Sequence, residues 1–440
     1  MLFVSAFILR LISLNQSLWL DETTTANVVR NLSYIEILSK FSPHDFHPPF
    51  FYLFMKFWTN IFGYTEVSLR MPSVLASLVT GYIVYKLAKN LKLDKSLGLW
   101  ASAFFLFNPL IVYYSQEARM YSMVTLFTTL VAYFVSKIDV SRIRSGMSNM
   151  ILTNVFIFLS LITFYGSVFF IATLYLYLLF KRKYKLIIYI LPGTLLSSVL
   201  LYPLFMTQLH NSGEVLKAIP NWSLTLGKAN LKNLLLIPLK LTSGRLSFEP
   251  KWLYFGISGI WVSYIGYMLA RVGLQSKKFT VLFYYLKTPV LIGFIVSFYK
   301  PMLQYFRFIY ILPFLSILLV ASTHKKWERF LLLSGFMFFS LLYLLNPSFH
   351  REDWRSLVAS LPEKSVALLP SSIDPVLYYD PSIKTYDIRS LRTGDESIVV
   401  IPYAEQIYGV DHAAILSGKK YKLKSTKTFR GLTYEIWSQE

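Results

Sequence analysis

The feature that most constrains this chain is a series of long apolar segments separated by short polar connections. Over 440 residues, 55% are hydrophobic and only 15% are charged. This composition is far from that of a soluble globular protein and predicts a polytopic membrane protein. Aromatic residues make up 17% of the chain, as expected where many helix ends meet a membrane interface. Cysteine is absent, which excludes disulfides and thiolate metal sites.

Eleven of the apolar segments predict membrane spans. A further segment, Phe50–Phe62, follows His47-Pro48-Pro49 and is too short to cross, because a spanning helix needs about 20 residues. We expect it to lie along the membrane surface, in the polar loop that begins near residue 15. The predicted spans are 1–18, 69–86, 96–113, 120–136, 150–166, 167–180, 186–206, 251–270, 279–298, 304–322 and 329–346.

The net charge of +21 is concentrated in the apolar part of the chain. From Ser348 onward there are 12 Lys and Arg against 12 Asp and Glu, so residues 1–347 carry the whole excess. A nucleic-acid partner is therefore not expected, because the excess lies where it sets membrane topology.

Alternate short loops carry 17 cationic residues, and the loops between them carry only Arg119, Lys300 and Arg307. The positive-inside rule places the 17 in the cytoplasm. The first loop, the turn near 113–120, the 207–250 loop and the C-terminus then face outside the cell membrane. The 17 are Lys86, Lys89, Lys92, Lys95, Lys137, Arg142, Arg144, Lys181, Arg182, Lys183, Lys185, Arg271, Lys277, Lys278, Lys325, Lys326 and Arg329.

After residue 347 the sequence changes to that of a soluble domain. Residues 353–358 predict a helix, and four β-rich runs follow at 365–369, 397–401, 421–429 and 432–437, with Gly, Pro and Asp between them. We predict an all-α membrane domain over 1–347, with interfacial helices in its first outer loop, and a small extracytoplasmic α/β domain over 348–440.

Charged and polar side chains recur on the outer loops. The planar guanidinium of an arginine can donate two hydrogen bonds at once to a phosphate. A carboxylate near the interface can act as general base for a hydroxyl. Two histidines, two arginines and several carboxylates can also hold a metal–phosphate ensemble. The residues are Asp21, Glu22, His44, Asp45, His47, Glu117, Arg119, Tyr121 and Arg307.

Each of these residues alone also has a structural explanation. Asp21-Glu22 can be a solvated helix cap, Arg119 and Arg307 can be interface anchors, and Glu117 can pair with Arg119 or cap a helix. Single histidines such as His44 and His47 are mostly structural or solvated.

Taken in order, these elements resemble the GT-C glycosyltransferases, in particular the protein O-mannosyltransferase and aminoarabinose-transferase-like group. The motifs are Leu18-Trp19-Leu20-Asp21-Glu22, Asp45-Phe46-His47-Pro48-Pro49-Phe50, residues 62–73, Asn108-Pro109 and residues 114–121. The resemblance is specific over residues 15–125 and looser to about residue 350.

The resemblance implies transfer of a hexose or pentose from a polyprenyl or dolichyl phosphate to an acceptor hydroxyl outside the cytoplasm, with inversion. It implies Asp21 and Glu22 as the catalytic acids, with Asp21 as general base and Glu22 supporting it or contacting the acceptor. It implies Arg119, Tyr121, Arg307 and His47 as contacts of the donor phosphate. His47 stands where some relatives have a lysine, which leaves open a divalent metal held by Asp45 and His47. No nucleotide cofactor is implied, in keeping with the absence of a Gly-rich phosphate loop.

Two alternatives to a transferase remain on the sequence alone. A membrane transporter or lipid flippase would place ionisable residues deep in its spans and often show internal repeats. A non-catalytic membrane scaffold would not require acids and arginines on several separate outer loops. The acceptor is left open among lipid, protein and polysaccharide.

Overall fold

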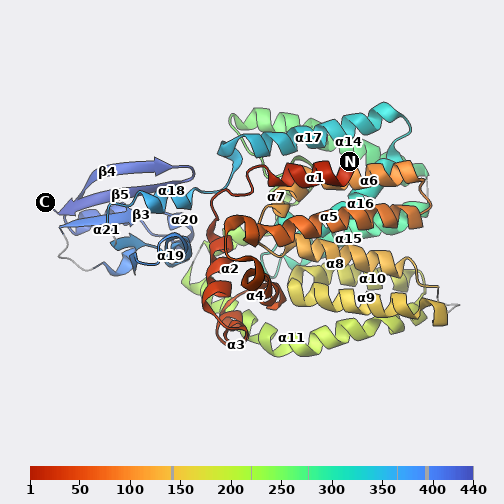
Figure 1. The fold of residues 1–440 in the computed structure, drawn as a ribbon, viewed down its shortest axis with the longest axis horizontal. Coiled ribbons are helices and arrows are strands. Elements are labelled where there is room, and N and C mark those ends of the chain that lie inside the picture. Colours follow the sequence, from red (N-terminus) through yellow and green to blue (C-terminus); the bar gives the residue numbers. More distant parts are fainter. Residues whose placement is uncertain (140–142, 220, 276, 364, 392–395, 440) are drawn as a thin grey trace.

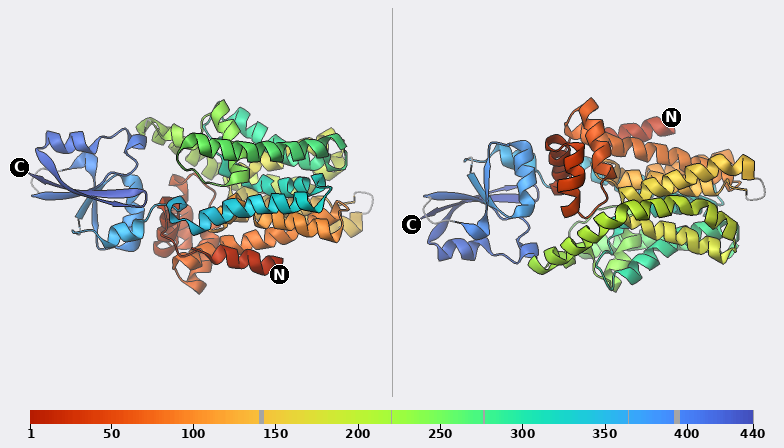
Figure 2. Two further views of the ribbon diagram at one scale, coloured as in Figure 1. Left: turned by 90° about the horizontal axis from the view of Figure 1, so that it is seen from above. Right: turned by 90° about the horizontal axis from the view of Figure 1, so that it is seen from below.

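The computed structural model describes all residues except 140–142, 220, 276, 364, 392–395 and 440. A helical bundle forms one end of the molecule and a small sheet domain forms the other (Figure 1). Helices α2 (Leu20–Asn31), α3 (Tyr34–Glu36) and α4 (Phe50–Phe62) lie across the end of the bundle that faces the sheet domain (Figures 1 and 2). Arg142, one of the cations predicted to be cytoplasmic, lies outside the described residues.

The bundle consists mostly of helices that match the predicted apolar segments, and it also contains helices within 15–46 and 207–250, which were predicted to be loops. Its first part comprises α1 (Leu2–Leu11), α2 (Leu20–Asn31), α3 (Tyr34–Glu36), α4 (Phe50–Phe62), α5 (Glu66–Asn90), α6 (Lys95–Leu106), α7 (Pro109–Ser115), α8 (Tyr121–Val135), α9 (Ile143–Thr163) and α10 (Val168–Phe180). Its second part comprises α11 (Tyr184–Ala218), α12 (Trp222–Leu226), α13 (Leu231–Ser243), α14 (Lys251–Gln275), α15 (Thr280–Val296), α16 (Leu312–Ser322) and α17 (Lys326–Leu345). A 3₁₀ segment, Tyr305–Ile311, leads into α16.

Among the described residues, six helices are long and apolar enough to cross a membrane, or seven if α6 and α7, bent by 60°, form one broken span. Four shorter apolar helices, α1, α8, α10 and α15, coincide with the other predicted segments. The chain is thus a multi-pass membrane protein, as predicted, while the number of eleven crossings stays a prediction. The connections α5–α6, α10–α11 and α16–α17, rich in predicted cytoplasmic cations, lie at the end of the bundle away from the sheet domain (Figure 1).

The 207–250 segment is helical over much of its length. Helix α11 is 35 residues long and continues past the predicted span to Ala218. Beyond its end, Asn221 donates its backbone N–H to Ile407 O at 3.3 Å and its side-chain amide to Gln406 O at 2.8 Å. The segment that follows α11 therefore joins the bundle to the sheet domain.

The sheet domain is a five-stranded mixed sheet covered by short helices. Its strands are β1 (Ser365–Leu368), β2 (Lys384–Asp387), β3 (Ser397–Ile401), β4 (Tyr421–Phe429) and β5 (Leu432–Gln439), in the order β2-β1-β3-β5-β4. Strand β1 runs parallel to β2 and β3, whereas β5 is antiparallel to β3 and β4. The helices are α18 (Trp354–Ala359), α19 (Ile373–Tyr379), α20 (Glu405–Tyr408) and α21 (His412–Gly418). The predicted α/β architecture is confirmed, but the sequence missed strand β2.

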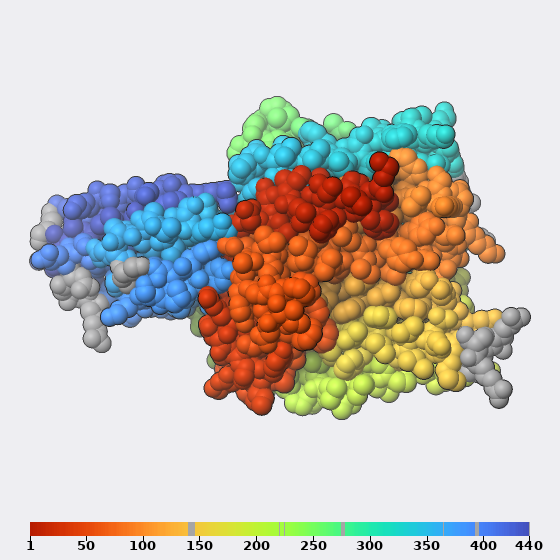
Figure 3. Space-filling model, in the orientation of Figure 1, coloured from red at the N-terminus to blue at the C-terminus, as the bar shows by residue number. Residues whose placement is uncertain are grey.

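The bundle and the sheet domain have separate hydrophobic cores. One large cluster fills the bundle, and two smaller clusters, around Trp354 and Trp437, flank the sheet. The space-filling view shows the N-terminal helices against the C-terminal sheet domain (Figure 3). We propose that these are two domains divided at residues 347 and 348.

Candidate active site

The two adjacent acids at the start of α2 have different surroundings. The Glu22 side chain is wholly buried, whereas 44% of the Asp21 side chain is exposed. Successive residues of an α-helix point about 100° apart, so one acid can face the bundle while the other faces the outer end. Both stand in the first turn, where a negative charge interacts favourably with the helix dipole.

Glu22 is held by a buried ion pair. Arg70 of α5 donates to the Glu22 carboxylate from Nε at 2.8 Å and from Nη2 at 2.6 Å. The Ala118 N–H donates to the same carboxylate at 2.7 Å, and the Trp19 N–H does so at 3.4 Å. Glu22 thus closes the start of its own helix, as the cap interpretation expects, and fixes the 116–119 turn to it.

Arg70 also holds the segment that precedes α2. Its guanidinium donates to Leu14 O at 2.9 Å, Gln16 O at 2.7 Å and Ser17 O at 3.1 Å. No role for Arg70 is predicted above from the sequence. The available signal was its position in an apolar span, where an ionisable residue requires a buried partner.

Arg119 faces Asp21. Its Nη2 lies 3.5 Å from Asp21 Oδ2, and its Nη1 donates at 3.4 Å to Asp21 O, Thr25 Oγ1 and Tyr52 OH. The side chain is 4% exposed, and its Nε has no hydrogen-bond partner within the described residues. Burial alone would lower the pKa of Arg119, but Tyr52 and Asp21 raise it well above its ordinary value. The result is a permanent buried cation beside a half-exposed carboxylate.

His47 and Asp45 form a second pair on the loop before α4. His47 Nδ1 lies 3.5 Å from Asp45 Oδ1, and Gln208 of α11 donates to His47 O at 3.1 Å. Burial would raise the pKa of Asp45, but His47 and Arg119 hold it below its ordinary value of 3.8. Asp45 is therefore ionised at neutral pH.

Aromatic rings connect His47 to Arg307. The His47 ring stacks on Phe164 with centroids 6.3 Å apart, and Phe164 packs edge-on against Tyr121 at 5.8 Å. Tyr121 packs in turn against Phe306 at 5.3 Å. The guanidinium carbon of Arg307 lies 6.0 Å from the centroid of the Phe306 ring. The predicted phosphate contacts His47, Tyr121 and Arg307 thus belong to one cluster of packed aromatic rings.

Glu117 lies on the other side of the 116–119 turn. It is 3% exposed, and its Oε1 accepts from Nε and Nη2 of Arg351, each at 3.4 Å. Burial raises the pKa of Glu117 above its ordinary value of 4.5, while Arg351 counteracts part of that effect. The expected pairing with Arg119 is absent from the described contacts, and Arg351, which the sequence did not single out, takes its place.

Asp45 and His47 are the two described residues that could ligate the divalent metal considered from the sequence. The His44 side chain is exposed, and no ion pair joins it to an acid in the described part of the chain, so Asp45 and His47 stand alone. No group of three or more His, Asp or Glu able to hold a metal occurs among the described residues. Two protein ligands do not make a closed site, so we derive no step through a metal.

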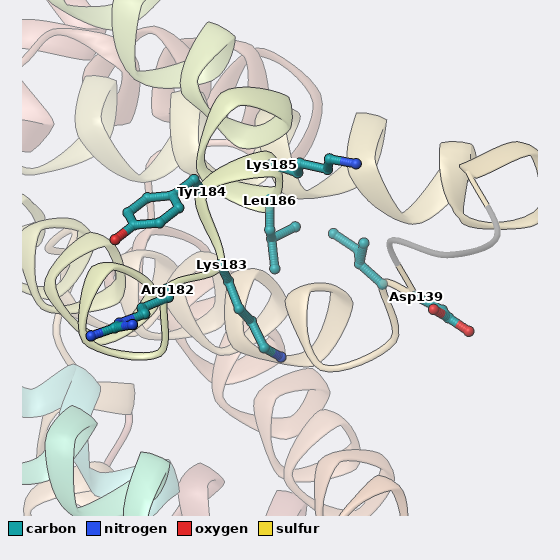
Figure 4. A pocket seen from close by; sticks show the side chains of 7 residues that line it. Asp139, Arg182, Lys183, Tyr184, Lys185 and Leu186 are labelled. Atoms are coloured by element: carbon teal, nitrogen blue, oxygen red, sulfur yellow. The ribbon is translucent and has the colours of Figure 1, made fainter.

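A shallow cavity of about 600 Å³ lies at the opposite end of the bundle. Lys183 of the α10–α11 connection and Lys185 and Leu186 of α11 extend toward the segment that carries Asp139 (Figure 4). Arg182 and Tyr184 extend away from it (Figure 4). These cations belong to the set that sets the predicted topology. The cavity is therefore separate from the candidate active site.

Comparison with known proteins supports the resemblance. Residues 46–208 match the family model described as dolichyl-phosphate-mannose-protein mannosyltransferase. That segment includes His47, Arg119 and Tyr121. No protein with a curated description matches the chain.

Solved structures share the fold over nearly the whole chain. ArnT from Cupriavidus metallidurans in the apo state has a TM-score of 0.63 at 12% identity, covering 99% of this chain and 97% of ArnT. The same protein bound to undecaprenyl phosphate has a TM-score of 0.59 at 12% identity, with the same coverage of both chains. The oligosaccharyltransferase AglB from Archaeoglobus fulgidus, in complex with an inhibitory peptide and a dolichol-phosphate, has a TM-score of 0.52 at 9% identity, covering 99% of this chain and 73% of AglB. The predicted GT-C fold is confirmed.

Proposed function

Because this chain has the GT-C fold of ArnT and of archaeal AglB, we propose that it is a membrane glycosyltransferase. It takes its sugar from a polyprenyl or dolichyl phosphate. The match of residues 46–208 to the mannosyltransferase family supports this proposal. The two similar structures with bound undecaprenyl phosphate and dolichol-phosphate support the donor class. The observation that carries the proposal is the half-exposed Asp21 carboxylate 3.5 Å from the buried Arg119 guanidinium.

Asp21 acts as the general base. It removes the proton of the acceptor hydroxyl while the acceptor oxygen attacks the anomeric carbon, and the bond from that carbon to the donor phosphate breaks. The electron pair leaves with the polyprenyl phosphate, so a single displacement inverts the anomeric centre. Glu22 has its carboxylate occupied by Arg70 and Ala118, and we therefore give it a positioning role.

Arg119 stabilises the departing phosphate. It is buried and cationic, and its unpartnered Nε is a donor free for a further acceptor within the described contacts. A fixed cation at a developing negative charge can lower a barrier by several kcal/mol. Tyr121, His47 and Arg307 belong to one cluster of packed aromatic rings and complete the proposed phosphate site, with the isoprenyl chain entering from the membrane.

We propose that the acceptor reacts on the extracytoplasmic side of the membrane. The connections rich in cations lie at one end of the bundle, and helix α2 and the sheet domain lie at the other. Helix α2 carries Asp21, and Arg119 lies beside Asp21. The positive-inside rule then places the site outside the cytoplasm, in the cell membrane. The acceptor is a hydroxyl of a lipid, protein or polysaccharide.

The deciding experiment is transfer of radiolabelled sugar in membranes that contain the protein. Polyprenyl phosphates carrying mannose, glucose or a pentose are supplied as donors to wild type, Asp21→Asn and the control Glu36→Gln. Glu36 forms an exposed ion pair with Lys40 on the same outer loop, so its loss should leave transfer intact. Loss of transfer in Asp21→Asn but not in Glu36→Gln supports Asp21 as the general base. Full activity of Asp21→Asn refutes that role.

Two further arms test the alternatives. If the protein moves polyprenyl phosphate across the membrane of vesicles but transfers no sugar, the transporter or flippase hypothesis is favoured over the transferase. Treatment with a chelator tests the divalent metal at Asp45 and His47, and unchanged transfer after treatment would dismiss it.

A further inference from the structure

Arg351 lies in the connection between α17 and α18, far from the acids in sequence, yet it contacts both segments that carry the proposed catalytic pair. Its guanidinium carbon lies 3.5 Å from the centroid of the Trp19 ring. The same guanidinium donates to Glu117 at 3.4 Å from two nitrogens. Trp19 precedes Asp21 by two residues, and Glu117 precedes Arg119 by two residues.

These contacts leave little freedom to the two short segments. Glu22 already connects them once, because its carboxylate accepts from Trp19 N–H and from Ala118 N–H. Arg351 connects them a second time, through the Trp19 ring and the Glu117 carboxylate. Because the Arg351 side chain is only 14% exposed, solvent cannot readily replace these contacts.

The sheet domain in turn fixes Arg351. Arg430, in the turn between β4 and β5, donates from Nε to Arg351 O at 2.8 Å. The backbone carbonyl of Arg430 accepts from the Asp353 N–H at 3.0 Å. The turn therefore holds the backbone of the connection on both sides of Glu352.

We propose that Arg351 is a positioning residue through which the sheet domain sets the geometry of Asp21 and Arg119. This rests on the proposed function, because the geometry matters only if those two side chains serve the transfer. A planar guanidinium is required, since it stacks on an indole and donates from two nitrogens at once. A lysine keeps the charge but provides neither the flat stacking surface nor the paired donors.

The test compares Arg351→Ala and Arg351→Lys with Arg355→Ala. Arg355 also joins the sheet domain to the bundle, through Glu66 and Asn15 O, but it touches neither Trp19 nor Glu117 in the described contacts. We expect both Arg351 variants to lower kcat about 10- to 100-fold, because small misplacements of reacting groups have effects of that order. Arg355→Ala should stay within about twofold of wild type, because a solvent-exposed ion pair contributes little.

Two measurements separate positioning from folding. The first is the melting temperature in detergent, which should fall no further in Arg351→Lys than in Arg355→Ala. The second is a double-mutant cycle of Arg351→Ala with Glu117→Gln. The losses in kcat should not add, because each substitution removes the same contact between Arg351 and Glu117. Additive losses, or a kcat for Arg351→Lys equal to that of Arg355→Ala, would overturn the proposal.

Affinity for undecaprenyl phosphate gives a readout that needs no transfer. Arg351→Ala should weaken this binding and Arg355→Ala should not, because Arg119 is displaced only in the first. If wild type neither transfers sugar nor binds the lipid phosphate, the proposed function fails and this inference with it. If wild type does both and the Arg351 variants match it, only this inference fails.

Discussion

The carboxylate of Glu22 and the guanidinium of Arg70 form a wholly buried ion pair with two hydrogen bonds, at 2.8 and 2.6 Å. This pair separates the roles of two adjacent acids. Glu22 is committed to the scaffold, and Asp21 is left half-exposed beside Arg119.

Arg70→Met should destabilise the protein by about 3–5 kcal/mol, because Glu22 would remain buried without its cation. The double variant Glu22→Gln with Arg70→Met should recover part of the loss, since the introduced amide carries no charge and can still accept from Ala118 N–H. Thermal unfolding in detergent measures both. Equal stability of Arg70→Met and wild type would show that the pair does not hold the fold.

Arg119→Lys should weaken use of the lipid-phosphate donor about 10-fold or more, because a lysine keeps the charge but loses the paired donors that match a phosphate. The measurement is the KM for the donor in the transfer assay. Arg30→Lys, at an exposed arginine over the Tyr64 ring, is the matched control and should keep the wild-type KM. An unchanged KM in Arg119→Lys would leave Arg119 as an anchor only.

Gly193→Ala should destabilise the bundle by about 1–3 kcal/mol, through overpacking between α9 and α11. A Cβ at Gly193 would lie 2.4 Å from Asn154 O and 2.9 Å from Asn154 Cα, which are backbone atoms that cannot easily move. Gly213→Ala, in the same helix, meets no atom within 4 Å and should be neutral or stabilising by up to about 1 kcal/mol. Unfolding of the two variants in one detergent makes the comparison, and equal stabilities would contradict it.

Glu117→Gln should remove a pH dependence of stability. The folded-state pKa of Glu117 is raised above 4.5 by burial. Between 4.5 and that raised pKa, the folded state holds a proton that the unfolded state has released, so stability falls as pH rises through this window. A glutamine at this position cannot titrate, so the decline should be missing from the melting temperatures of the variant.

The control for this measurement is Glu36→Gln. The hydrogen bond and charge of Lys40 lower the pKa of Glu36 to about 2, so Glu36 is ionised in both states above about pH 5. Its variant should keep the wild-type decline. Parallel curves for wild type and Glu117→Gln would show that Glu117 does not titrate with folding.

The helical body could be predicted because long apolar segments have few alternatives in a membrane. Strand β2 was missed because Lys384–Asp387 is polar and lies at the sheet edge, where no alternating apolar pattern is needed. Helix α13 was missed because it is short and contains Pro238, which normally interrupts a helix.

The candidate site was predictable only where its residues belong to local motifs. Asp21 and Arg119 stand in such motifs, and in the fold their side chains lie side by side. The different environments of Asp21 and Glu22 depend on the rotation of one helix against its neighbours. Arg351 is 234 residues from Glu117 in the sequence. No sequence pattern predicts a contact that forms only when one domain packs against another.

The length of helix α11 has a mechanical consequence. Its 35 residues span about 52 Å, whereas the hydrocarbon core of a membrane is about 30 Å thick. The surplus carries the chain beyond the membrane, and Asn221, just past the end of α11, then donates to Gln406 O and Ile407 O of the sheet domain. The connection through Arg351 holds the domain at a second place.

Helix α2 also contacts the domain directly, because Asn27 donates to Asp374 O at 3.0 Å, and the Arg355–Glu66 ion pair joins the domain to α5. A domain held at several separate places cannot rotate about any one of them, so the sheet domain should move together with the outer end of the bundle.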